Sequence, residues 1–341
     1  MVNDNDARRE GGGLWNQTGS TMVVNTVTLS ENTASGPAED DGGGAIFNNG
    51  GTLNLNGSTL SGNSADGLLG TGGGLHVNAG TANVMLTTIS GNSSLTIGGG
   101  IYNNAQLMIN ASTIALNTAT VNGGGIYNNS TMITSLKNTI ISGNISVGAG
   151  ADLFSDEAAI SSGGYNLIGI NNGDFTENDN DITGTLADPV MASLLPLADN
   201  GGETFTHALN CPSPAADMGD MADTFSDQAG QAVFNGRRDI GAFEAQQNCA
   251  LSTNNIIAGV SKSMLYPNPS VNGFVNIRFA ENRDANFTVT IYDLATGKLL
   301  QTTNATGTDI QMNVEKYAAG TYIVKITSDN AVETQKLIIQ N

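Results

Sequence analysis

The sequence has little positive charge, few aromatic residues and only two cysteines. Its 341 residues include 12 Lys and Arg against 31 Asp and Glu, and aromatic residues make up 5%. The net charge of −19 argues against nucleic acid and an anionic membrane as partners, because both attract Lys and Arg. No apolar run is long enough to span a bilayer, and the N-terminal stretch MVNDNDARRE lacks the apolar core of a signal peptide. Two cysteines are too few for a zinc site on their own.

The charge is distributed unevenly along the chain. Residues 1–250 hold 5 basic and 24 acidic residues, whereas residues 251–341 hold 7 of each. Between Glu10 and Gly236 the only basic residue is Lys137. This break predicts two units of different origin that meet near residue 250.

A repeat is the strongest signal in residues 1–150. Glycine-rich heptads such as GGGLWNQ and GGGIYNN recur at spacings of 32, 29, 26 and 25 residues. The heptads begin at Gly11, Gly43, Gly72, Gly98 and Gly123. Later in each unit a signature like TLSGN closes on an asparagine, at Asn32, Asn63, Asn92, Asn117 and Asn144. Short runs of Leu, Ile, Val and Thr between these landmarks predict an all-β, right-handed parallel β-helix with one unit per coil. Because the sequence starts within this pattern, we expect the β-helix to be truncated at its N-terminus.

The glycine triplets have two interpretations, a phosphate-binding loop or a corner of the coil. A phosphate loop needs one glycine stretch that is closed by Lys and Ser or Thr, whereas this chain has five and none is followed by Lys. The triplets therefore predict corners with positive φ. The same alignment places His76 among Trp15, Phe47, Tyr102 and Tyr127. We expect this histidine to stack with aromatic rings and not to bind a metal.

Motifs beyond the repeat resemble a known family. GYNLIG, NDITGTLADPV, LLPLADNGGETFTHAL, SPAADMGD and NGRRDIGAFE follow one another between about residues 163 and 244. In this order they resemble bacterial β-helix surface proteins of the choice-of-anchor type. The resemblance implies that residues 151–250 form the last coils and a C-terminal cap of the β-helix. It implies a surface-attachment module after the cap and no enzymatic activity.

Residues 151–250 contain a candidate disulfide and a candidate calcium-binding loop. Cys211 and Cys249 lie on either side of the end of this region. They form one disulfide if the protein is in an oxidising compartment, or they are two buried thiols. A run of acids imitates an oxygen-rich calcium loop, but the full calcium-loop pattern is absent, so a solvated acidic turn is the stronger interpretation. The acids are Asp174, Glu177, Asp179 and Asp181. No other cofactor is expected.

Residues 262–341 follow a linker at residues 251–261 and have a different pattern. FVNIRF, NFTVTIYDL, TYIVKIT and TQKLIIQ alternate apolar and polar residues, as the strands of a small Ig-like β-sandwich do. With the opening YPNPSVNG, they resemble the C-terminal sorting domain of type IX secretion cargo from Bacteroidota. The matching residues are Tyr266, Pro267, Asn268, Pro269, Gly297, Lys298, Gly320, Tyr322, Lys336, Leu337, Ile338, Ile339 and Gln340.

The second resemblance implies a secreted, cell-surface protein. Its partners are then the outer-membrane secretion machinery and a sorting protease that removes the domain. Surface lipopolysaccharide and extracellular polysaccharide are further candidate partners.

Three functions remain for the coils. We expect a non-catalytic, adhesin-like or structural scaffold. The alternative is a polysaccharide lyase or hydrolase, but a lyase needs a basic residue and the coils offer only Lys137. A hydrolase needs paired carboxylates, which do not recur at one position of the coil. The third function is binding to ice or another crystal surface through a flat threonine array, formed by Thr28, Thr59, Thr88, Thr113 and Thr139.

Overall fold

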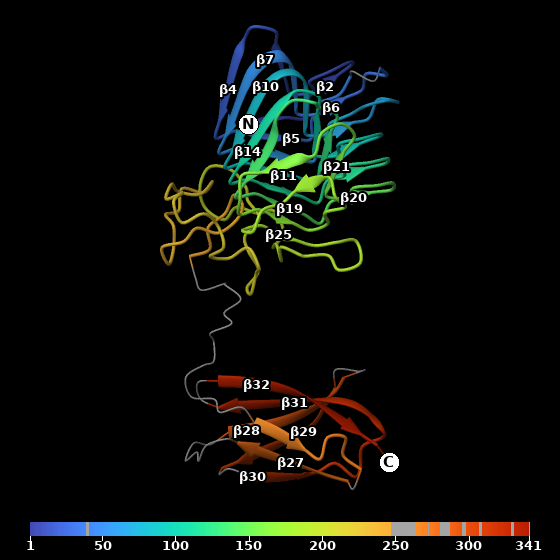
Figure 1. The fold of residues 1–341 in the computed structure, drawn as a ribbon, viewed down its shortest axis with the longest axis vertical. Coiled ribbons are helices and arrows are strands. Elements are labelled where there is room, and N and C mark those ends of the chain that lie inside the picture. The colour runs from blue at the N-terminus through green and yellow to red at the C-terminus, as the bar shows by residue number, and fades with distance from the viewer. Residues whose placement is uncertain are drawn as a thin grey trace. The chain divides into compact units, whose positions relative to one another are not determined.

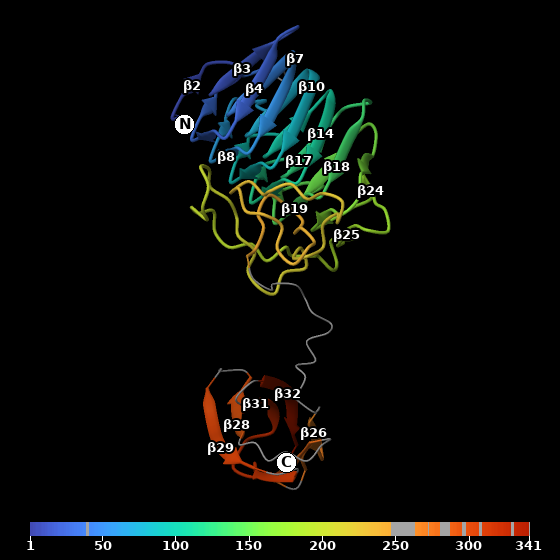
Figure 2. The same ribbon diagram turned by 90° about the vertical axis from the view of Figure 1, so that its left-hand side faces the viewer.

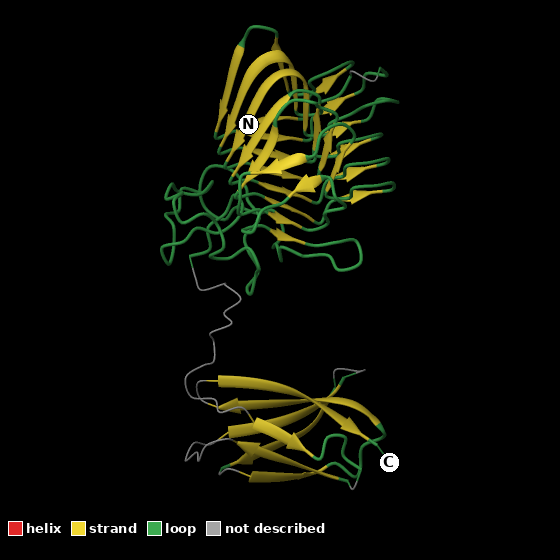
Figure 3. Ribbon diagram, viewed as in Figure 1, coloured by secondary structure: helices red, strands yellow, loops and turns green. Residues whose placement is uncertain are grey.

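The computed structural model describes residues 1–38, 41–246, 263–271, 273–279, 287–294, 298–306, 309–328 and 331–340. These residues form strands and loops without a helix, which confirms the all-β prediction (Figure 3). Accordingly, they include no helix that is long and apolar enough to cross a membrane. The chain divides into two compact units, Met1–Leu251 and Ser252–Asn341.

The first unit is a parallel β-solenoid of about six turns, as predicted (Figures 1 and 2). Its strands form three parallel sheets, which we call sheets A, B and C. Sheet A contains β1 (Val2–Asn3), β5 (Thr28–Ser30), β8 (Thr59–Ser61), β11 (Thr88–Ser90), β15 (Thr113–Ala115), β19 (Ile140–Ser142), β23 (Leu167–Ile168) and β25 (Ile182–Thr183). Sheet B contains β2 (Asp6–Ala7), β6 (Thr33–Ala34), β9 (Ser64–Ala65), β12 (Ser93–Ser94), β16 (Thr118–Ala119) and β20 (Ile145–Ser146). Sheet C contains β3 (Leu14–Gln17), β4 (Thr21–Asn25), β7 (Ile46–Asn56), β10 (Leu75–Met85), β13 (Ile101–Asn103), β14 (Gln106–Asn110), β17 (Ile126–Asn128), β18 (Thr134–Lys137), β21 (Leu153–Ser155), β22 (Ile160–Ser162) and β24 (Phe175–Thr176).

The second unit consists of two antiparallel sheets around a core of its own. One sheet has the order β26-β27-β30 and the other β29-β28-β31-β32. Val275, Ile277, Val289, Val324 and Leu337 are completely buried between them. The strands are β26 (Ser263–Tyr266), β27 (Phe274–Phe279), β28 (Phe287–Asp293), β29 (Leu299–Ala305), β30 (Asp309–Asn313), β31 (Gly320–Ser328) and β32 (Ala331–Ile339).

The core of the solenoid is a set of apolar stacks that run from coil to coil. Ile46, Leu75, Ile101, Ile126 and Leu153 lie in register along sheet C, and all five are fully buried. Burying one such side chain contributes roughly 1.5 to 3 kcal/mol. The register also shows a sixth coil beyond the five glycine heptads, because Leu153 pairs with Ile126 although the triplet before it has become Gly-Ala-Asp.

An asparagine ladder runs beside this core at the turn that follows sheet A. Asn63 Nδ2 donates to Asn92 Oδ1 at 2.8 Å, and Asn92 Nδ2 donates to Asn117 Oδ1 at 2.9 Å. The ladder ends at Asp152 Oδ1, which accepts hydrogen bonds from the backbone N–H and the side chain of Asn144. Burial raises the pKa of Asp152 to about 6, against the opposing effect of these hydrogen bonds. The ladder thus satisfies polar groups that no solvent reaches.

The glycine triplets form corners, as predicted. Gly98 has a φ of +67°, and a Cβ on Gly99 would lie 2.4 Å from the carbonyl oxygen of Thr118. Larger residues therefore do not fit at this corner.

The aromatic stack that the sequence predicts is present from Phe47 onward, whereas Trp15 is 42% exposed and its Nε1 donates to Glu10 Oε1 at 3.2 Å. Ring centroids are 4.4 Å apart for Phe47 and His76, 4.6 Å for His76 and Tyr102, and 5.8 Å for Tyr102 and Tyr127. Phe154 of the sixth coil extends the stack, at 5.3 Å from Tyr127. Burial lowers the pKa of His76 to about 3, so this imidazole is neutral at physiological pH.

Candidate functional site

Residues 184–246, which we call the flank segment, cover the outer face of sheet A (Figures 1 and 2). Thr59 Oγ1 donates to the carbonyl oxygen of Phe205 at 2.6 Å. Two coils further on, the backbone N–H of Ala242 donates to Thr113 Oγ1 at 3.0 Å. The segment that the resemblance describes as a cap therefore lies along the side of the solenoid as far back as β8.

The flank segment removes most of the threonine array from solvent. Thr59 and Thr88 are fully buried and Thr113 is 1% exposed. The strand register also places Ile140, and not Thr139, beside Thr113. Because ice binding requires an exposed flat array, these contacts argue against that function.

Two polar side chains of the flank segment hold it against sheet A. Gln228 Nε2 donates to Thr59 Oγ1 at 2.9 Å, while its Oε1 accepts from Thr88 Oγ1 at 2.7 Å. His207 Nε2 lies 2.7 Å from Ser90 Oγ, and burial lowers the pKa of this histidine. Both residues are at least 94% buried, so they serve the fold and are closed to a ligand.

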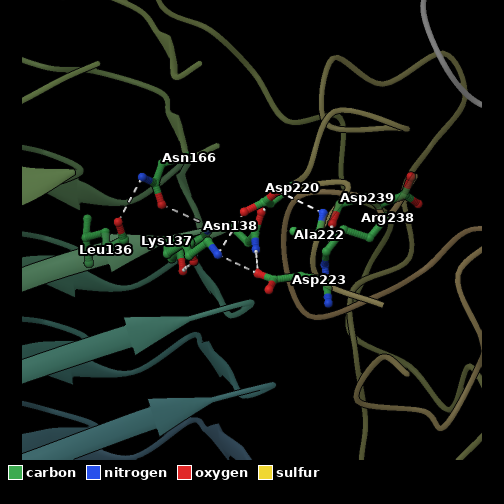
Figure 4. Close-up of polar contacts among 10 residues, drawn as sticks. Leu136, Lys137, Asn138, Asn166, Asp220, Ala222, Asp223, Arg238 and Asp239 are labelled. Atoms are coloured by element: carbon green, nitrogen blue, oxygen red, sulfur yellow. Dashed lines mark hydrogen bonds and ion pairs between the residues drawn. The ribbon is translucent and has the colours of Figure 1, made fainter. Parts of the chain in front are cut away.

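Lys137, the one candidate base of the coils, is held in an ion-pair cluster (Figure 4). Its Nζ lies 2.8 Å from Asp220 Oδ2 and 2.9 Å from Asp223 Oδ2, both in the flank segment. Asn138 Nδ2 also donates to Asp223 Oδ2 at 2.7 Å. The hydrogen bond to Asp220 is the largest effect that raises the pKa of Lys137 above its usual value. The amine is therefore protonated at neutral pH and unsuited to abstract a proton.

Four charged residues of the flank segment are buried together. Arg238, Asp227, Asp239 and Glu244 are between 2% and 5% exposed. Burial raises the pKa of Asp239 to about 6 and that of Glu244 to about 7. Arg238 counteracts these shifts through its positive charge and stacks over Phe225, with its guanidinium carbon 4.3 Å from the ring centroid.

Raised carboxyl pKa values are also found in catalytic acids, but the hydrogen bonds here indicate a structural role. Each of the six carboxylate oxygens of Asp227, Asp239 and Glu244 accepts a backbone N–H from a loop of the flank segment. No oxygen is left to face a substrate. The motif NGRRDIGAFE thus supplies two of the three carboxylates that fix these loops, Asp239 and Glu244.

The acidic loop that resembled a calcium site distributes its acids among separate partners. Asp181 accepts hydrogen bonds from the backbone and side chain of Asn166 and from the backbone of Asn178. Glu177 accepts a hydrogen bond from Thr183. Among the described residues, no three His, Cys, Asp or Glu side chains are placed to hold a metal ion. Calcium binding by Asp174, Glu177, Asp179 and Asp181 stays the untested alternative to a solvated acidic turn. The disulfide between Cys211 and Cys249 stays a prediction, since Cys249 lies outside the described residues.

The residues of the second resemblance lie in or beside strands β26, β29, β31 and β32 of the second unit. Tyr266 ends β26, and Pro267, Asn268 and Pro269 follow it at the surface. Lys298 precedes β29, while Gly297 lies outside the described residues. Gly320 and Tyr322 begin β31, and Lys336, Leu337, Ile338, Ile339 and Gln340 form the end of β32 and the residue after it.

Asn268 connects the first of these motifs to the last. Its Nδ2 donates to the carbonyl oxygen of Lys336 at 2.7 Å, and its Oδ1 accepts from the N–H of Ile338 at 2.9 Å. Ser270 continues this pairing through its own N–H and carbonyl, to Ile338 and Gln340. Because β32 is the outermost strand of its sheet, the asparagine acts as a substitute for a neighbouring strand.

We expect Asn268→Ala to loosen the end of β32. The substitution removes two hydrogen bonds, each worth about 1 kcal/mol. Hydrogen exchange of the Ile338 amide in the full chain should accelerate by about tenfold. Asn276→Ala is the matched control, because Asn276 donates to Tyr266 and does not contact β32. Equal protection of Ile338 in both variants would contradict this role of Asn268.

Comparison with known proteins identifies the second unit. Residues 264–340 match the family model of the secretion system C-terminal sorting domain. A search of curated proteins finds no match to the chain. A type IX sorting domain marks a protein that is exported to the cell surface or the extracellular space, and it implies an interaction with the secretion machinery.

Proposed function

We propose that this chain, which carries a type IX sorting domain at residues 264–340, displays its β-solenoid as a non-catalytic scaffold or adhesin outside the cell. The ion pairs of Lys137 are the observation that supports the non-catalytic part of this proposal. The only basic residue between residues 11 and 235 is neutralised by Asp220 and Asp223, so a lyase lacks its base. The buried carboxylates of the flank segment are likewise occupied by backbone amides.

The stacked architecture suits display on a surface. Each coil contributes its own apolar layer and hydrogen bonds to its neighbours, so the solenoid presents a long, regular surface. The flank segment covers sheet A from β8 onward, which leaves sheets B and C and the loops between them as exposed surfaces of the coils. We infer that a sorting protease removes the domain and that the passenger is then joined to surface lipopolysaccharide or released.

The export part of the proposal is tested by expressing two forms in a type IX host, both fused to the same cleavable signal peptide that brings them to the periplasm. The full chain should reach the cell surface or the medium, while a form that ends at residue 262 should remain in the periplasm. Fractionation followed by immunoblotting against the solenoid measures this directly. Equal export of both forms would show that the sorting domain is not required and would overturn the proposed route.

A further inference from the structure

We propose that the solenoid binds a neutral sugar residue of a polysaccharide in a cavity beside Tyr102 and Tyr127. The inference rests on the proposed function and names the class of ligand that the displayed scaffold would hold. The cavity has a volume of about 300 Å³, which is at the lower end of ligand pockets and suits one sugar residue better than a long segment. Its lining residues are Leu69, Thr71, Thr96, Ile97, Tyr102, Tyr127 and Asn129.

The cavity arises from a change in loop length along the solenoid. The loops from sheet B to the glycine corners are long at residues 35–42 and 66–71, but short at residues 8–10, 95–97, 120–122 and 147–149. Phe47 and His76, in the coils with long loops, are at most 1% exposed. The aromatic stack becomes partly accessible at Tyr102, where Leu69 of the second long loop and Ile97 of the short loop that follows it line the cavity. The decreasing repeat spacing is the sequence signal of this step.

The chemistry of the lining suits a sugar. Five of the seven lining residues carry a neutral hydroxyl or amide, and the other two, Leu69 and Ile97, offer an apolar surface for the C–H groups of a pyranose. Asn129 Nδ2 donates to Tyr102 Oη at 3.3 Å, and Thr96 Oγ1 donates to the carbonyl oxygen of Gly70 at 2.7 Å. These hydrogen bonds hold the polar groups in position before a ligand arrives, which lowers the entropic cost of binding.

The stack also determines how the tyrosines meet a ligand. Tyr102 lies between His76 and Tyr127, and Tyr127 lies between Tyr102 and Phe154. Since neighbouring rings occupy their faces, the tyrosines offer the cavity their edges and hydroxyl groups. Recognition therefore depends on hydrogen bonds to the sugar more than on ring stacking.

The charge around the cavity selects against acidic sugars. No lining residue carries a charge, and Lys137 is engaged by Asp220 and Asp223 on the side of the flank segment. One charged residue contacts the lining directly, since the carboxylate of Asp156 accepts the hydroxyl hydrogen of Tyr127. A uronate or a sulphate would meet the negative charge of Asp156 and no cation among the lining residues.

The test measures binding of oligosaccharides to the full chain by isothermal titration calorimetry. The probes are gluco-, manno-, galacto- and N-acetylglucosamine oligomers, with galacturonate oligomers and a sulphated galactan as acidic counterparts. We expect at least one neutral series to bind and the acidic probes to bind at least tenfold more weakly. Tyr102→Phe, which keeps the ring in the stack and removes the hydroxyl, should weaken binding by about tenfold.

A matched pair of leucines tests the position of the site. Leu69→Ala removes a wall of the cavity and should weaken binding by about tenfold, whereas Leu68→Ala should leave it unchanged, because Leu68 is 76% exposed and lies outside the lining. Thermal unfolding of each variant verifies that the solenoid stays folded.

Three results would overturn the site: no neutral probe that binds at millimolar concentration, equal or tighter binding of acidic probes, or binding that Tyr102→Phe and Leu69→Ala leave intact. If the chain reaches the surface in the fractionation assay and the titration gives any of these results, only the sugar site is overturned. Failure of export overturns the proposed route and leaves the titration result standing.

Discussion

Asn92→Ala should destabilise the solenoid by about 3 to 5 kcal/mol, because it interrupts the asparagine ladder in its middle. Asn92 Nδ2 donates to the carbonyl oxygen of Leu60 at 3.0 Å and to Asn117 Oδ1 at 2.9 Å. Its Oδ1 accepts from the backbone and side chain of Asn63 at 2.9 and 2.8 Å. Alanine removes the partner of three groups on the preceding coil, namely the backbone N–H of Asn63, one side-chain N–H of Asn63 and the carbonyl oxygen of Leu60. Each buried group left without a hydrogen bond costs roughly 1 to 3 kcal/mol. Asn117 Oδ1 keeps the backbone N–H of residue 92.

Equilibrium unfolding in urea measures this loss. The fluorescence of Trp15, the single tryptophan, reports on the solenoid because this residue lies in β3. Asn104→Ala serves as the control, since Asn104 is exposed and its removal should change the free energy of unfolding by less than about 0.5 kcal/mol. If Asn92→Ala behaves like the control, the ladder does not stabilise the coils as argued here.

Arg238→Met should destabilise the flank segment by about 3 to 5 kcal/mol at pH 7.5 and by less at pH 5. Methionine retains an apolar stem beside Phe225 but removes the positive charge that opposes Asp227, Asp239 and Glu244. Three buried carboxylates are then left without a compensating cation. Proteolysis within residues 184–246 and the free energy of unfolding both report the loss.

The pH dependence has a definite sign. Because burial raises the pKa of Asp239 to about 6 and of Glu244 to about 7, the folded state binds more protons than the unfolded state between about pH 4 and 7. Lowering the pH through this range protonates these carboxylates and therefore reduces the free-energy cost of burying their charge. This gain in stability is larger in Arg238→Met, which lacks the compensating positive charge. His76 acts in the opposite direction, because its lowered pKa favours the unfolded state below about pH 6.5, but it contributes equally to both proteins.

Arg237→Met is the control that distinguishes the loss of a buried positive charge from the loss of ordinary arginine contacts. Arg237 is partly exposed and donates from Nε to the carbonyl oxygen of Gly219 at 2.8 Å. We expect Arg237→Met to lower the free energy of unfolding by about 1 kcal/mol, with little dependence on pH. Equal, pH-independent losses in both variants would contradict the role assigned to Arg238.

The features predictable from the sequence are those that repeat. A corner that excludes a Cβ, a ladder of amides and an alternating strand recur once per coil, so five copies of each appear in register in the sequence. The sixth coil escaped the heptad alignment because Ala151 and Asp152 replace the last two glycines. Asp152 is there for a physical reason, since its carboxylate provides an acceptor for the last asparagine of the ladder.

The position of the flank segment was not predictable in the same way. Its contacts join residues far apart in the chain, such as Gln228 with Ser58, and no period relates the two partners. The burial of Thr59 and Thr88 and the capture of Lys137 by Asp220 follow from these contacts. The sequence identifies Lys137 as the only candidate base of the coils, but it does not reveal that Asp220 and Asp223 lie beside its amine.

The most direct test of the non-catalytic scaffold is the chain length of polysaccharides after incubation with the folded full chain and calcium. A panel of plant, algal and host polysaccharides, analysed by size-exclusion chromatography, covers the lyase and hydrolase alternatives. We predict that no chain is shortened and that a neutral polymer is retained by the protein. Shortened chains would contradict the account and would direct attention to the acidic residues at the coil corners.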